Sequence, residues 1–88
     1  MKPSAQLVDL LRDLRARRMD RPALARWLAQ HSIHFLESTS EADRVIVADL
    51  DAALGEVQAG RAGEPHLSSV ASELAAKFDL DASQVILT

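Results

Sequence analysis

The chain carries an internal repeat. When residues 5–35 are aligned with residues 48–78, an offset of 43, eight of the 31 pairs are identical. Self-similarity at a period of about 20–50 residues usually marks one supersecondary unit used more than once. The identical pairs are Ala5/Ala48, Leu7/Leu50, Leu11/Leu54, Ala16/Ala59, Arg18/Arg61, Pro22/Pro65, Leu24/Leu67 and Phe35/Phe78. The repeat therefore predicts that one unit is built twice.

Each copy of the unit reads as a helix, a short turn that opens on proline, and a second helix. Proline is well placed at the first helical position, where its missing N–H sacrifices no hydrogen bond. Apolar residues recur at the three- and four-residue intervals of one helical face, first at Leu7, Leu10, Leu11 and Leu14. The expected helices are about 4–18, 22–36, 41–58 and 65–78.

The second and fourth helices carry matching apolar stripes. The second has Leu24, Trp27, Leu28, His31 and Phe35, and the fourth has Leu67, Val70, Ala71, Leu74 and Phe78. The third helix follows a polar break, in which Ser40 and Asp43 resemble a capping box. Gly55 inside it predicts either a close neighbouring backbone or a locally weak helix, and Gly60 is placed as its C-terminal cap.

These patterns predict an all-α fold of four helices in two αα-hairpins that pack face to face. One domain, residues 1–88, would hold repeat units 4–36 and 41–78, with a turn or tail over 79–88. Composition agrees, because 48% of residues are apolar and only three are aromatic, which favours close-packed helices over a sheet. The absence of cysteine excludes disulfides and cysteine-based zinc sites.

No stretch approaches the roughly 20 apolar residues of a membrane span, and the N-terminus has no apolar run typical of a signal peptide. We therefore expect a soluble, cytoplasmic protein without a membrane partner.

Metal and cofactor sites are weakly supported. His31 and His34 lie one helical turn apart and Glu37 follows, which could give two imidazoles and a carboxylate to a metal. However, His31 aligns with Leu74 of the repeat and so takes a core-facing position. Residues 79–83 imitate the start of a calcium loop but lack its turn glycine. We expect no metal and no cofactor.

Catalytic constellations are equally scarce. The chain has no cysteine, no tyrosine and no glycine-rich phosphate loop. His66 lies near Ser68, Ser69 and Ser72 on the expected fourth helix, but no third group is placed to orient such a pair. We expect no enzymatic activity.

The last residues are spaced like a DNA-binding helix-turn-helix. Apolar side chains fall at its usual intervals, at Leu74, Phe78, Leu80 and Val85. However, Asp79 takes the turn position that usually holds glycine, and residues 81–88 contain no Lys or Arg. Because phosphate contacts supply most of the affinity for DNA, this charge pattern disfavours DNA reading by the segment.

Charge is divided unequally between the halves. Residues 1–36 hold seven basic and three acidic residues, whereas residues 37–88 hold three basic and ten acidic residues. Such asymmetry can mean an interaction surface, and it can equally mean two halves that attract each other across a bundle. The candidate partner-binding residues are Arg12, Arg15, Arg17, Arg18, Arg21, Asp49, Asp51 and Glu56.

The resulting expectation is a small helical protein–protein interaction module, of the accessory, regulatory, antitoxin-like or immunity-like kind. The oppositely charged halves and the apolar Val85–Leu87 would also suit a homodimer. The alternative is a nucleic-acid-binding protein that uses the arginine-rich first hairpin or a degenerate C-terminal helix-turn-helix.

Overall fold

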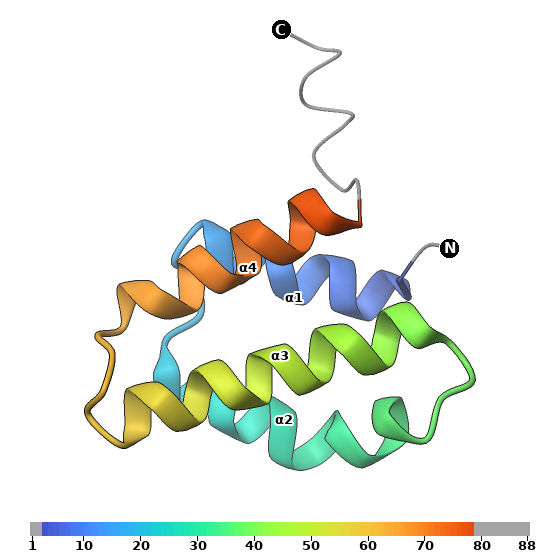
Figure 1. The fold of residues 1–88 in the computed structure, drawn as a ribbon, viewed down its shortest axis with the longest axis horizontal. Coiled ribbons are helices and arrows are strands. Elements are labelled where there is room, and N and C mark those ends of the chain that lie inside the picture. The colour runs from blue at the N-terminus through green and yellow to red at the C-terminus, as the bar shows by residue number, and fades with distance from the viewer. Residues whose placement is uncertain (1–2, 79–88) are drawn as a thin grey trace, which may run out of the picture.

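A computed structural model describes residues 3–78, which form four α-helices (Figure 1). Their bounds are α1 Ala5–Arg15, α2 Arg21–Leu36, α3 Glu41–Gln58 and α4 Pro65–Lys77. The all-α prediction is confirmed, and each helix begins and ends within three residues of its expected range. The predicted turn or tail over 79–88 lies outside the described residues.

The helices pack in the order α1, α4, α3, α2. Helix α4 contacts both α1 and α3, and α3 contacts both α4 and α2. Neighbouring helices run antiparallel, and α2 forms the lower edge of the molecule in Figure 1. The expected α3–α4 hairpin is present. Helices α1 and α2 are joined by a short turn, but each makes its main contacts with a helix of the other half.

One hydrophobic core joins all four helices. The largest side chains that are fully enclosed are Leu7, Leu11, Leu14, Leu24, Ile46, Val47 and Leu50. The predicted stripes of α2 and α4 face this core, with Trp27, Val70 and Phe78 packed at its edge. Because a 16-residue helix such as α2 gains most of its stability from packing one face, the core also fixes the orientation of its other face.

The C-terminal ends of α1 and α3 share one geometry. Arg17 and Gly60, which the repeat makes equivalent, both adopt left-handed backbone conformations, with φ of 60° and 78°. The next residue in each case donates its N–H to a carbonyl one turn back, as in a Schellman motif: Arg18 to Asp13 and Arg61 to Glu56, both at 2.9 Å. The two ends are therefore matched at the offset of 43, and duplication of the unit stays a prediction.

Side chains cap the starts of α2 and α3. Ser40 accepts the N–H of Asp43 at 3.3 Å, as the capping pattern predicts, and Asp20 accepts the N–H of Ala23 at 3.0 Å. Asp43 is itself buried, and its carboxylate accepts the backbone N–H of Ser4 at 2.9 Å. This bond ties the start of α1 to the start of α3.

The sequence offered two explanations for Gly55, a close neighbouring backbone or a locally weak helix, and the structure excludes the first. A Cβ atom at Gly55 would meet nothing within 4 Å, and the residue is exposed. The close-contact interpretation is therefore wrong. The remaining interpretation is a locally weak helix, since glycine disfavours helical backbone by about 1 kcal/mol relative to alanine.

Candidate functional site

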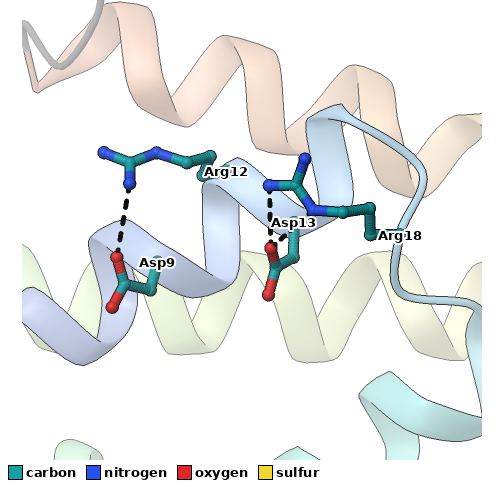
Figure 2. Close-up of polar contacts among 4 residues, drawn as sticks. All are labelled: Asp9, Arg12, Asp13 and Arg18. Atoms are coloured by element: carbon teal, nitrogen blue, oxygen red, sulfur yellow. Dashed lines mark hydrogen bonds and ion pairs between the residues drawn. The ribbon is translucent and has the colours of Figure 1, made fainter.

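Two of the predicted arginines pair with acids along α1 and the turn that follows it (Figure 2). Arg12 lies 3.7 Å from Asp9, and Arg18 lies 2.9 Å from Asp13, measured from guanidinium nitrogen to carboxylate oxygen. Exposed pairs of this kind contribute about 0–1 kcal/mol. Part of the positive charge of the first half is therefore offset by its own acids.

The other predicted arginines lie at the turn between α1 and α2. Arg15 is half-buried, and Arg17 is exposed in its left-handed conformation. Arg21 donates its backbone N–H to the carboxylate of Glu64, its equivalent in the repeat, at 3.1 Å. A cavity of about 180 Å³ opens here, lined in part by Arg17, Arg21, Glu64, Leu14 and Leu67. It is smaller than the roughly 300–1,000 Å³ of most ligand pockets and suits a single side chain.

The predicted acids lie on α3. Asp49 and Asp51 are exposed. Glu56 accepts a hydrogen bond of 2.6 Å from Arg61 Nε, and this bond, together with the arginine charge, lowers the pKa of Glu56. The ion pairs of Arg12, Arg18 and Glu56 each join residues of the same half. A binding role for the eight predicted residues stays a prediction.

The sequence interpretation missed an apolar surface on α2. Within residues 3–78, the large apolar side chains that are exposed are Ile33 (69%) and Leu36 (46%). Ala29 is also exposed and lies four residues before Ile33. Residues spaced by three and four share one helical face. Ala29, Ile33 and Leu36 therefore form one strip, here named the α2 outer stripe.

The α2 outer stripe lies away from the core-facing side of the same helix, where Leu24, Leu28 and Phe35 are buried. Helix α2 is thus apolar on two sides, although it has one main neighbour, α3. A helix that is apolar on more than one side is normally covered on more than one side. The spacing of Ala29, Ile33 and Leu36 was the signal that could have identified this surface from the sequence.

Helix α4 provides an internal control for this surface. At the offset of 43, Ala29 and Ile33 correspond to Ser72 and Ala76, which are both exposed, and Leu36 corresponds to Asp79 in the sequence. The positions that correspond in the sequence therefore hold small or polar residues. An apolar stripe at this position is a property of α2 and no requirement of the repeated unit.

Aromatic rings stack along α2. The Trp27 ring lies 4.8 Å from His31 and 5.7 Å from Phe35, between ring centroids, and His34 meets the edge of Phe35 at 5.1 Å. His31, expected to face the core, is half-buried, and His34 is exposed. Within residues 3–78, no three His, Cys, Asp or Glu side chains gather as a metal site would need. Of these rings, Phe35 is buried in the core and Trp27 packs against it.

Opposite charges stand at the two ends of the α2 outer stripe. Arg26 precedes Ala29 by three residues, and Glu37 follows Ile33 by four, so both lie on the same side of the helix. Both residues are exposed, and within residues 3–78 neither forms an ion pair. The surface is therefore an apolar strip with a positive end and a negative end.

No helix among the described residues combines the length and apolar character of a membrane span. No family model, curated protein or solved structure matches the chain.

Proposed function

We propose that this protein is a small helical interaction module that binds a protein partner through the α2 outer stripe. It would act as an accessory or regulatory subunit, of the antitoxin-like or immunity-like kind, by covering or positioning that partner. The observation that carries the proposal is the 69% exposure of Ile33, at a position where the equivalent residue of α4 is Ala76.

The physical support is the free energy available from covering this strip. Full burial of one isoleucine or leucine side chain contributes about 1.5–3 kcal/mol. Contiguous exposed apolar side chains with a charged border are typical of protein-binding surfaces. The edge position of α2, which has α3 as its main neighbour, leaves this surface accessible.

The test is affinity capture from an extract of the source organism, with bound proteins identified by mass spectrometry. We expect the wild-type chain to retain a partner that Ile33→Asp loses. Ala76→Asp is the matched control, because it places the same charge at the equivalent exposed position of α4. Equal capture by wild type and Ile33→Asp would contradict binding through this surface.

The predicted arginines would act at the edge of such a complex. Exposed charges mainly raise the association rate and set its salt dependence. Replacement of Arg17 and Arg21 by Glu should therefore slow association at low salt and leave the dissociation rate nearly unchanged.

The alternative function, nucleic-acid binding by the first hairpin, depends on the same arginines. The pairs of Arg12 with Asp9 and of Arg18 with Asp13 weigh against it, because they reduce the positive charge open to phosphates. A salt-dependent shift in duplex mobility that is lost on changing Arg15, Arg17 and Arg18 to Glu would favour this alternative over protein binding.

A further inference from the structure

We infer that the α2 outer stripe packs against the same stripe of a second copy of this chain, with the two α2 helices antiparallel about a two-fold axis. This inference rests on the proposed function, because it names the partner that the surface takes. A two-fold interface must be complementary to itself, so that residue i of one copy meets j of the other and j meets i.

Charge meets this requirement. Arg26 and Glu37 are 11 residues apart in the sequence, about 16 Å along a helix at 1.5 Å per residue. When two α2 helices lie antiparallel, Arg26 of each copy faces Glu37 of the other, which forms two identical ion pairs. A parallel pair would bring like charges together. The charges therefore select the antiparallel arrangement.

Side-chain size is also self-complementary in the same antiparallel register. When Arg26 faces Glu37 of the second copy, Ile33 lies within one residue of facing Ala29 of that copy. By the two-fold symmetry, Ala29 of the first copy meets Ile33 of the second in the same way. A large side chain thus meets a small one twice, which allows close approach of the helices. Leu36 falls beside Arg26 of the second copy, whose aliphatic stem can cover it.

Helix α4 lacks both features. The residues equivalent to Arg26, Ala29 and Ile33 are Ser69, Ser72 and Ala76, all of them exposed. That face has neither the apolar strip nor the charge at its start. Self-pairing is thus assigned to α2 alone, and variants at the equivalent positions of α4 serve as controls.

The contact involves one helix of 16 residues from each copy. Interfaces below about 1,200 Å² are commonly weak and transient. We therefore expect a reversible dimer that forms in the micromolar range and dissociates on dilution.

Sedimentation velocity of the full chain, from about 1 to 500 µM, tests this expectation. The wild-type mass should rise from one chain to two across the series. Ile33→Asp should remain a single chain throughout, whereas Ala76→Asp should associate like wild type. Since both positions are exposed, thermal melts followed by circular dichroism should show both variants folded. A wild-type chain that stays monomeric, or a dimer that survives Ile33→Asp, overturns the inference.

Charge exchange tests the antiparallel register. Arg26→Glu should weaken the dimer by about tenfold, because each ion pair becomes a repulsion. The double variant Arg26→Glu/Glu37→Arg should regain wild-type association to within about threefold, since the pairs are restored with their signs exchanged. If the double variant is as weak as Arg26→Glu, the register is wrong.

The capture experiment separates this inference from the proposed function. A monomeric wild-type chain that still captures a different protein through Ile33 refutes the dimer and leaves the proposed function standing. A monomeric chain whose capture is unaffected by Ile33→Asp refutes both.

Discussion

Helices α2 and α4 correspond to each other in the sequence repeat, yet they present different outer faces. Both have proline within their first two residues, and both bury a leucine, Leu24 or Leu67, in the common core. On the outside, α2 exposes Ile33 where α4 exposes Ala76. The positions at which the two helices agree are those that form the core and the helix ends. The positions at which they differ are therefore ones where the fold does not require a particular residue.

The same contrast exists at the ends of α1 and α3. Gly60 adopts its left-handed conformation without steric conflict, whereas Arg17 adopts it with a Cβ atom that crowds the backbone. The first half thus retains an arginine at a place where glycine is the favoured residue. Both departures from the common unit, Arg17 and Ile33, lie in the first half.

The largest expected effect tests the shared core. Leu24→Ala and Leu67→Ala should each lower the free energy of unfolding by about 2–5 kcal/mol, because both leucines are buried and each substitution leaves a cavity. Urea denaturation followed by circular dichroism measures both losses. A negligible loss at either position would break the equivalence of the two halves.

Substitutions at the C-terminal ends of α1 and α3 should change the free energy of unfolding in opposite directions. Gly60→Ala should lower the free energy of unfolding by about 1 kcal/mol, since it adds a Cβ atom to a left-handed residue. Arg17→Gly should raise it by about 0.5 kcal/mol, because it removes that conflict at some cost in chain entropy. Thermal denaturation of the two variants checks both signs. Destabilisation by Arg17→Gly would show that its side chain stabilises the turn.

The smallest effect concerns the ion pair at the end of α3. The hydrogen bond from Arg61 and its charge hold the pKa of Glu56 below its ordinary value of 4.5. A carboxylate whose pKa is lowered by folding stabilises the folded state at pH values above its pKa in the unfolded chain. This stabilisation is lost as the pH falls through its pKa in the folded state. Glu56→Gln should therefore be slightly less stable than wild type at neutral pH. The difference should shrink as the pH falls below 4.5 and vanish once the carboxyl is also protonated in the folded state.

Denaturation curves at several pH values check this difference, and added salt should reduce it, because the pair is exposed. A difference that persists in acid would mean that Glu56 acts through packing.

The helices themselves could be predicted from local signals. Pro22 and Pro65 mark the starts of α2 and α4, Ser40 caps α3, and the leucine stripes identify the buried faces. These features depend on residues close in the sequence, so spacing is sufficient to find them. The matched ends of α1 and α3 also follow the repeat, since their hydrogen bonds close within six residues.

The arrangement of the helices and the candidate surface required the structure. Spacing cannot tell whether α1 packs on α2 or on α4, because both faces are apolar. The bond from Ser4 to Asp43 joins residues 39 apart and has no local signal. The α2 outer stripe was overlooked because the sequence interpretation gave α2 a single apolar face, and the 69% exposure of Ile33 is known only once the neighbours of α2 are placed.

The most direct test of the account compares Ile33→Asp with Ala76→Asp in one experiment that measures both stability and binding. Both variants should unfold within about 4 °C of the wild-type temperature, because surface substitutions usually change stability by less than about 0.5 kcal/mol. Only Ile33→Asp should lose self-association and partner capture. Equal binding by the two variants would contradict the claim that the outer face of α2 is the functional surface.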